Sequence, residues 1–286
     1  MNPTIAVIAP GAMGSGVARR LTEHGAVVPT LLDGRSAATI ARARAAGMTA
    51  ADEATITAAD IILSILPPGE AVALAERLAP ALCAASRKPV YVDCNAVNVE
   101  TVQAIAAIIA PTGSAFVDGG IIGGPPVPGD AGPVLYLAGP ETSRLGMLGE
   151  LGLRIRMLDG PVGAASALKM CYAGINKGLT GLAAAMILAA DRAGAGPALH
   201  AELADSQPQL LAKFERSVPD MYAKAYRWVA EMREIADFLG PDDPARLIYE
   251  GMAGLYERLA ADVAGEKRDI AALDRFLATG KADAAA

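Results

Sequence analysis

The stretch that decides the fold is Ile8-Ala9-Pro10-Gly11-Ala12-Met13-Gly14. It follows the apolar, β-branched run Ile5–Ile8 and leads into Met13–His24, a segment with helical period. A short apolar run before a glycine turn, with an amphipathic segment after it, predicts a strand, a tight turn and a helix. The chain therefore opens with the strand–turn–helix arrangement that parallel sheets contain.

Two glycines of this turn suit a site for the pyrophosphate of a dinucleotide. Such a site needs one glycine where the backbone approaches the phosphates and another for close packing of the helix on the strand. Gly11 and Gly14 supply these two, whereas Ala9 replaces the first glycine of the fingerprint. Amide N–H groups and the helix dipole would then face the phosphates. We expect these contacts to come from Pro10, Gly11, Ala12, Met13 and Gly14.

The end of the second predicted strand bears on the choice between NAD(H) and NADP(H). Asp33 stands about 20 residues after the glycine turn, where an acidic side chain binds the ribose 2'-hydroxyl of NAD(H). Arg35 and Ser36 follow at once, and a guanidinium beside a helix-starting hydroxyl suits a 2'-phosphate by charge and geometry. We therefore expect NADP(H) to be preferred, with all three residues as cofactor contacts. The alternatives are a solvated loop charge for Arg35 and a plain helix N-cap for Ser36.

From residue 4 to about residue 160, β-branched runs alternate with Ala-rich amphipathic segments, which predicts a Rossmann-type α/β domain with a mostly parallel sheet. The predicted strands are Ile5–Ile8, Val27–Leu32, Ile61–Leu66, Val90–Asp93, Ala115–Asp118, Val134–Ala138 and Arg154–Leu158. The predicted helices are Met13–His24, Ser36–Ala46, Glu70–Leu82, Asn98–Ile109 and Glu141–Leu151.

After Pro161 the strand signals end, and the rest of the chain predicts an all-α domain. Ala164–Ala193 is one long helix with few charges, so we expect it to be buried on all sides, in the second domain or in a dimer interface. Later breaks are expected at 194–197, Pro208, Pro219 and 240–244, and the Ala-rich tail 281–286 is expected to fray. The predicted domains are therefore residues 1–160, which bind the dinucleotide, and 161–286, which serve substrate binding and dimerisation.

Composition restricts the partners. A net charge of −6 gives no electrostatic reason to bind nucleic acid. The 3 cysteines form no C-x-x-C pair, so we expect reduced, mostly buried thiols and no metal site. The most apolar helical segment, residues 181–190, falls short of the ~20 residues of a membrane span, and no cleavable signal precedes the first strand. We expect a cytoplasmic protein without membrane contact whose partner is a small-molecule substrate.

Several further motifs occur in the order found in one superfamily. They are Ser64-Ile65-Leu66-Pro67-Pro68, Asp93-Cys94-Asn95-Ala96, Phe116-Val117-Asp118-Gly119-Gly120-Ile121-Ile122-Gly123-Gly124 and Gly160-Pro161-Val162-Gly163 followed by Lys169. With the glycine turn, they make residues 4–190 resemble the β-hydroxyacid dehydrogenase and 6-phosphogluconate dehydrogenase-like superfamily, which has imine reductase relatives. The C-terminal part resembles a divergent, poorly characterised branch.

The resemblance implies roles for individual residues. Lys169 matches the lysine that acts as general acid and base on the substrate oxygen while hydride passes between the nicotinamide and the substrate carbon. The cofactor contacts that it implies are Leu66, Pro67, Asn95 and, more loosely, Arg233. The substrate contacts are Asn95, Ile122, Gly123, Gly124 and Tyr172, the last because it shares a helix face with Lys169 and carries a phenol.

Two departures from the family pattern bear on the substrate. Ile122 stands where the family has a serine, and Ala173 stands where it has an asparagine one helical turn after the lysine. Each lost hydrogen bond would weaken binding of a small charged hydroxy acid by about 1 kcal/mol or more. We therefore expect a relatively apolar carbonyl or alcohol substrate.

Two alternatives remain open at this point, together with one expectation about assembly. An imine reductase would suit an apolar pocket, although the retained Lys169 counts against it because the imine-reducing relatives usually carry another residue there. A catalytically inactive sensor or scaffold that still binds NADP(H) is an alternative of another class. The long apolar helix also predicts a homodimer.

Overall fold

The computed structural model describes residues 2–127 and 129–283, and the chain forms two compact units, 1–170 and 171–286. The boundary follows Met170, inside helix α7 (Ala164–Arg192), whereas the predicted domain boundary stood at residue 160. Amides at the start of α7 bond to Asp118 of the first unit, so the first turns of α7 pack with that unit.

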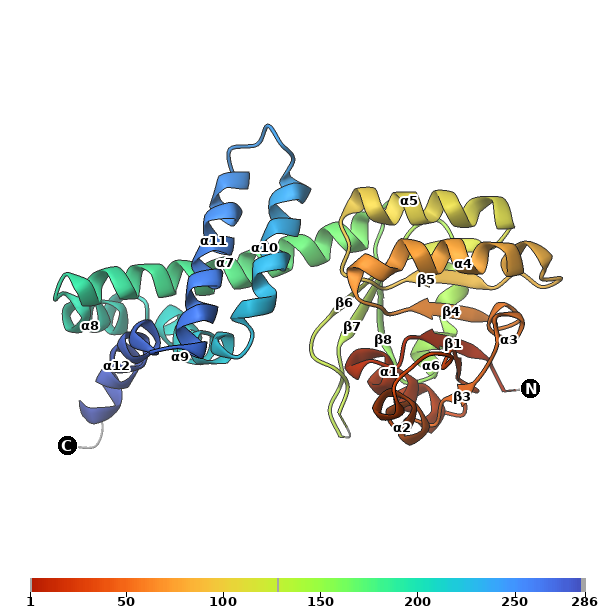
Figure 1. Ribbon diagram of the computed structural model, residues 1–286, viewed down its shortest axis with the longest axis horizontal. Coiled ribbons are helices and arrows are strands. Elements are labelled where there is room, and N and C mark those ends of the chain that lie inside the picture. Colours follow the sequence, from red (N-terminus) through yellow and green to blue (C-terminus); the bar gives the residue numbers. More distant parts are fainter. Residues whose placement is uncertain (1, 128, 284–286) are drawn as a thin grey trace. The chain divides into compact units, whose positions relative to one another are not determined.

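The first unit contains a six-stranded sheet in the order β1-β4-β5-β6-β7-β8, shown in Figure 1. Its strands are β1 (Ile5–Ile8), β4 (Ile61–Ser64), β5 (Val90–Asp93), β6 (Ala115–Ile122), β7 (Val134–Ala138) and β8 (Arg154–Met157). The strands from β1 to β6 are parallel, β7 runs antiparallel to β6, and β8 is parallel to β7. The predicted mostly parallel sheet is confirmed.

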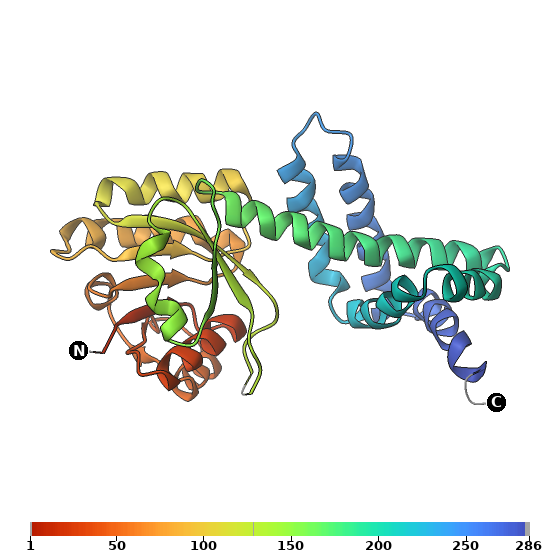
Figure 2. The same ribbon diagram turned by 180° about the vertical axis from the view of Figure 1, so that it is seen from behind.

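Helices cover both faces of this sheet. They are α1 (Ala12–Glu23), α2 (Ala37–Ala45), α3 (Glu53–Thr57), α4 (Ala71–Ala84), α5 (Val99–Ile109) and α6 (Met147–Glu150), with short 3₁₀ turns at Pro68–Glu70, Ala110–Thr112 and Thr142–Leu145. α4 and α5 lie on one face, and α1 and α6 lie on the other (Figures 1 and 2). Alternate residues of β1 enter the two cores, Ile5 and Val7 on the α1 side and Ala6 and Ile8 on the α4 side, as strand geometry requires.

The second predicted strand is shorter than expected. Instead of Val27–Leu32, the structure has β2 (Pro29–Thr30), which pairs with β3 (Thr49–Ala50), a strand that the sequence analysis missed. Val27 forms a separate bridge with Thr4 beside β1. Pro29 lacks the N–H that a continuous ladder needs, which accounts for the short pairing.

β6 is longer than predicted, because it continues through Gly119 and Gly120 to Ile122. A Cβ atom on Gly119 would lie 3.0 Å from the Asp93 carbonyl oxygen, and one on Gly120 would lie 2.7 Å from that of Ala165. These glycines therefore serve close backbone approach within a buried strand, not a loop. The predicted helix Glu141–Leu151 is also wrong, since a 3₁₀ turn and the short α6 replace it.

The second unit is helical, as predicted. Besides the rest of α7 it contains α8 (Gly196–Ser206), α9 (Pro208–Tyr222), α10 (Ala225–Leu239), α11 (Arg246–Ala264) and α12 (Arg268–Asp283). The predicted break at Pro219 is wrong, because Pro219 lies within the last turn of α9. The tail 281–286 was predicted to fray, but α12 extends through its first residues. Residues 284–286 of the tail lie outside the described part of the chain.

One face of α7 packs closely on α11. Cβ atoms on Gly174 and Gly181 would lie 2.9 Å and 2.5 Å from Tyr249 and Met252 of α11, so glycine lets the two helices approach. Another face carries Ile175, Leu182 and other apolar side chains that are more than half exposed. This face is therefore not buried within the second domain of one chain, and its burial in a dimer interface stays a prediction.

By length and composition alone, α7 could also cross a membrane. The sequence analysis had considered only residues 181–190 and had judged them too short for a membrane span. Core helices of soluble proteins can have the same length and apolar composition. In this window 39% of the residues are buried inside the protein.

Candidate active site

The glycine turn has the geometry of a phosphate cradle. Gly11 is the N-cap of α1, it is exposed, and a Cβ atom on it would have open space around it. A Cβ atom on Gly14 would overlap the carbonyl oxygen of Ala9, so only glycine lets the first turn of α1 lie against the end of β1. α1 also has no acidic residue in its first turn and no capping side chain among the described residues. Its amide end is thus open to an anion, which fits the pyrophosphate of a dinucleotide.

The other residues predicted to bind the phosphates flank this cradle. Ala12 begins α1 and is exposed, whereas Met13 is half-buried against the core on the α1 side of the sheet. Pro10 is buried, and its carbonyl oxygen accepts a hydrogen bond from Nε of Arg42 at 2.8 Å. These residues share one turn, so the structure brings the predicted phosphate contacts together.

The predicted ribose end of the site lies at the start of α2. Asp33, Arg35 and Ser36 are exposed, and Ser36 is the N-cap of α2, where its hydroxyl accepts the amide N–H of Thr39. The Arg35 guanidinium has a long contact of 4.0 Å with Glu70. An exposed pair at this distance contributes little, so it holds the guanidinium only weakly. The arrangement offers one anionic and one cationic group for the ribose.

Arg42 is a residue of this region that the sequence analysis missed. A chain of hydrogen bonds runs from Ser36 Oγ to Thr39 Oγ1 (3.0 Å), from Arg42 to Thr39 Oγ1 (3.3 Å) and from Arg42 to the Pro10 carbonyl. Ser36, Thr39 and Arg42 recur every third residue on one helix, and that spacing was the available signal. The chain joins the start of α2 to the glycine turn.

Asn95 connects the ends of β4 and β5. Its side-chain oxygen accepts the N–H of Leu66 at 2.5 Å, and its amide nitrogen donates to Ser64 Oγ at 2.8 Å and to Asp93. Only 2% of Asn95 is exposed, so these partners use its polar atoms. The structure therefore places Asn95 as a support for the segment of Leu66 and the exposed Pro67, which follows β4.

Buried polar groups gather at the ends of β5 and β6. Burial raises the pKa of Asp93 to about 7, and its Oδ2 atom has no hydrogen-bond partner among the described residues. Burial also raises the pKa of the adjacent Cys94 thiol, whereas the positive charge of Lys169 acts on the same thiol in the opposite direction. Asp118, which pairs with Asp93 at the end of β5, accepts the hydroxyl of Ser166 at 2.7 Å, and the half-buried Lys169 follows Ser166 by three residues on α7.

The predicted substrate residues fall in both units. Ile122 ends β6 and is half-buried, and Gly123 (φ 128) and Gly124 follow it. Tyr172 belongs to the second unit and is 52% exposed. Arg233, the loosely predicted cofactor contact, also belongs to the second unit, where it lies 3.8 Å from Glu257. The roles of Tyr172 and Arg233 stay predictions.

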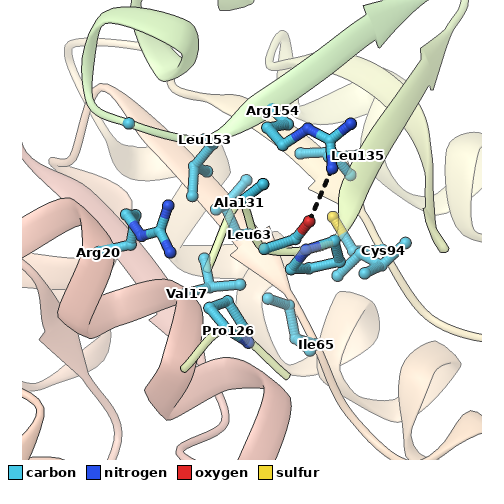
Figure 3. Close-up of a pocket in the computed structure, with 14 residues that line it drawn as sticks. Val17, Arg20, Leu63, Ile65, Cys94, Pro126, Ala131, Leu135, Leu153 and Arg154 are labelled. Carbon is cyan, nitrogen blue, oxygen red and sulfur yellow. Dashed lines mark hydrogen bonds between the residues drawn. The ribbon is translucent and has the colours of Figure 1, made fainter. Parts of the chain in front are cut away.

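A pocket opens on the α1 side of the sheet, beneath the chain that joins β6 and β7 (Figure 3). Its wall is mostly apolar, and its lining includes Val17, Leu63, Ile65, Cys94, Pro126, Leu135 and Leu153. Arg154 holds the overlying segment by donating to the carbonyl oxygen of Gly132 at 3.1 Å. None of the predicted cofactor or substrate residues lines this pocket.

The cysteines differ from the prediction in their burial. Cys94 is buried, but Cys83 and Cys171 are exposed, so the expectation of mostly buried thiols is wrong. Within residues 2–127 and 129–283, no group of His, Cys, Asp or Glu side chains could hold a metal ion.

An open parallel sheet with a glycine cradle at the first strand-to-helix turn defines a dinucleotide-binding protein. Residues 4–148 match the family described as the NAD binding domain of 6-phosphogluconate dehydrogenase, and the chain belongs to this family. Residues 190–259 match a domain of unknown function, DUF1932. A search of curated proteins found no match.

Solved structures support this placement. The conserved protein MTH1747, of unknown function and with structural similarity to 3-hydroxyacid dehydrogenases, is 25% identical, with a TM-score of 0.74 and coverage of 92% of this chain and 98% of its own. A 3-hydroxyisobutyrate dehydrogenase of Mycobacterium tuberculosis is 20% identical (TM-score 0.74; 92% and 96% covered). An imine reductase of Myxococcus stipitatus, solved with NAD⁺, is also 20% identical (TM-score 0.57; 97% and 100% covered). The chain is a dinucleotide-binding protein of the 6-phosphogluconate dehydrogenase-like superfamily.

Proposed function

We propose that this protein uses NADP(H) to interconvert a relatively apolar carbonyl compound and its alcohol, with Lys169 as general acid and base. The observation that carries the proposal is the bonding of Ser166 to Asp118, because it fastens the turn before Lys169 to the sheet that bears the glycine cradle. When bound, the nicotinamide supplies or accepts the hydride. Lys169 gives a proton to the substrate oxygen during reduction and takes it back during oxidation.

Neighbouring residues prepare the site for this proton transfer. Asn95 fixes the backbone of Leu66 through the 2.5 Å hydrogen bond, so the segment that would flank the cofactor is held in place. Ile122, half-buried at the end of β6, offers an apolar side chain where the family has a hydroxyl. An apolar wall favours an apolar substrate and helps to exclude water.

Turnover with NADPH on a panel of apolar ketones and aldehydes tests this function. The variant Lys169→Met should lower kcat by about 100-fold or more, as loss of a general acid does, while the Kd for NADPH stays within twofold. Lys224→Met is a matched control, because Lys224 lies on the second unit and pairs with Asp220. Full activity of Lys169→Met would refute the role of the amine.

An imine reductase is the second candidate, favoured by the apolar Ile122 and Ala173 at positions where the family is polar. The same panel should therefore include cyclic imines. Faster turnover of imines than of ketones, with activity that survives Lys169→Met, would select this candidate. A catalytically inactive sensor predicts tight NADPH binding and no turnover of any substrate, and such a result would refute both enzyme proposals.

The preference for NADP(H) rests on the exposed Arg35 beside the N-cap Ser36. We expect Arg35→Ala to raise the Kd for NADPH about tenfold, which corresponds to the loss of about 1.4 kcal/mol, and to leave the Kd for NADH nearly unchanged. Arg44→Ala is the matched control, since Arg44 lies exposed in the last turn of the same helix. Equal effects on both cofactors, or tighter binding of NADH by the wild type, would contradict the preference.

We further propose that the protein works as a cytoplasmic homodimer. Ile175, Leu182 and Met186 are 60%, 51% and 53% exposed on α7, and a second copy would cover them. Leu182→Glu should convert a dimer to a monomer in light scattering, whereas Leu247→Glu, at another exposed apolar residue of the second unit, should not. A monodisperse wild-type monomer, or recovery in the membrane fraction of cells, would refute this assembly and location.

A further inference from the structure

Asp118 is a carboxylate of the first unit that accepts four hydrogen bonds. It lies on β6, and its side chain is completely buried. Oδ2 accepts the amide N–H groups of Gly163 (2.9 Å), Ala165 (2.8 Å) and Ser166 (3.0 Å). Oδ1 accepts the hydroxyl of Ser166 at 2.7 Å. Four donors on one buried carboxylate satisfy most of its acceptor capacity.

These donors belong to the start of α7. The first amides of a helix have no partner within the helix, and α7 has no acidic residue in its own first turn. Asp118 provides the missing acceptor from a strand far away in the sequence, and its negative charge also faces the positive end of the helix dipole. The carboxylate therefore caps α7 and fastens it to the end of β6.

Two glycines make a seat for the capped turn. A Cβ atom on Gly120 would lie 2.7 Å from the Ala165 carbonyl oxygen, and one on Gly163 (φ 106) would lie 2.9 Å from Val99. Glycine at both positions lets the helix end approach β6 and α5 closely. The cap and the seat together leave the helix little freedom to slide or tilt.

Lys169 stands one turn further along the same helix. It follows Ser166 by three residues and Ala165 by four, so it shares their face. Side chains in helices lean toward the N-terminus, which brings this amine back toward the capped end. Ser166 on this face donates its hydroxyl to Asp118 Oδ1 at 2.7 Å, so the helix face that carries the amine begins at the cap.

We propose that Asp118 is a positioning residue, which holds Lys169 in its reactive place by capping and seating the first turn of α7. The catalytic consequence rests on the proposed function, but the positioning itself does not. A displacement of about 1 Å costs about 100-fold in rate when a reacting group must be aligned. The cap thus controls the rate of proton transfer and leaves the phosphate cradle on α1 untouched.

Three variants remove the hydrogen bonds of the cap to different extents. Asp118→Ala removes all four acceptor contacts and leaves buried amides without partners. Asp118→Asn keeps one oxygen for the three amides and can donate to Ser166 Oγ, but it has no charge. Ser166→Ala loses only the hydroxyl contact. Asp60→Ala is the matched control, because Asp60 also accepts a backbone amide, that of Thr4 at 2.8 Å, beside the start of β1.

The first experiment needs no turnover. Hydrogen exchange of residues 163–166 and competitive acetylation of Lys169, read by mass spectrometry, are compared among the folded variants without substrate. Exchange should rise about tenfold or more in Asp118→Ala, as expected for 1–3 kcal/mol of lost bonding, and the acetylation rate of Lys169 should change at least threefold. Asp118→Asn should show a smaller change, and it replaces Asp118→Ala if the latter does not fold. Asp60→Ala should change neither readout.

The second experiment separates positioning from general damage. With an active substrate, Asp118→Asn should lower kcat about tenfold to 100-fold, while the Kd for NADPH stays within twofold. Unchanged acetylation of Lys169 together with increased exchange would overturn the proposal, because the cap would then stabilise the helix without placing the amine. If the wild type turns over no substrate, the proposed function fails, and the acetylation result alone decides the role of Asp118.

Discussion

Replacing the two glycines of the cradle separates its two physical roles. Gly11 has φ −68 and ψ −174, a conformation open to any residue, and a Cβ atom there would meet no atom within 4 Å. Gly14 is different, because its Cβ atom would overlap the carbonyl oxygen of Ala9 and lie 3.1 Å from the carbonyl carbon. Gly11→Ala should therefore damage the site alone, whereas Gly14→Ala should damage the fold as well.

The expected magnitudes follow from these contacts. Gly11→Ala should change the free energy of unfolding by less than about 0.5 kcal/mol. Its methyl group would stand between the backbone amides and the phosphates, and the loss of about two charge-assisted hydrogen bonds should raise the Kd for NADPH about 100-fold or more. Gly14→Ala forces the start of α1 away from β1, which should cost about 1–3 kcal/mol of stability, as overpacking does, besides the loss of binding.

Urea unfolding followed by circular dichroism gives the stabilities, and NADPH fluorescence titration gives the affinities. Gly254→Ala is the control, since Gly254 lies in α11 of the second unit with nothing within 4 Å of its Cβ position. It should be neutral or stabilise the protein by less than about 1 kcal/mol. A folded Gly11→Ala variant that binds NADPH like the wild type would refute the proposed place of the pyrophosphate. Wild-type stability of Gly14→Ala would refute the argument from close packing.

Three further predictions concern single features of the structure. Burial raises the pKa of Asp93 to about 7, so the stability that its protonated form provides is lost as pH rises from about 4 through 7. Over that range the free energy of unfolding of Asp93→Asn should increase relative to that of the wild type, by at most about 4 kcal/mol. Urea unfolding at several pH values measures this, and a stability difference that stays constant with pH would contradict it. Ser36→Ala and Asn98→Ala each remove a helix N-cap and should each cost about 1 kcal/mol, but only Ser36→Ala should weaken NADPH binding in a fluorescence titration. Gly174→Ala should lower Tm, because its Cβ atom would lie 2.9 Å from the Tyr249 hydroxyl, whereas Gly178→Ala, whose Cβ atom would lie 3.8 Å from the Tyr249 ring, should not; equal Tm values would show that α11 adapts.

The exposed face of α7 shows where helical periodicity stops being informative. The run Ala164–Ala193 predicted the helix correctly to within a residue, since period and composition are local properties. The sequence left open where this helix is buried, because an apolar side chain such as Ile175 does not reveal whether the same chain or a second copy covers it.

The sequence by itself determined the six strands of the main sheet, the glycine cradle and the long helix. Each of these depends on residues that are close together in the chain, such as Gly11 and Gly14, whose spacing alone requires a tight strand-to-helix turn.

Only the tertiary structure decided which distant groups share one site. Asp118 reaches α7, Arg42 reaches Pro10 and Asn95 reaches Leu66 across separations that no local pattern records. The predicted strand ended at Asp118, before Gly119 and Gly120, because these glycines are explained only by the close approach of Asp93 and Ala165 from other parts of the chain. Such contacts form only when the sheet is assembled, since buried polar groups then have to find partners wherever the fold puts them.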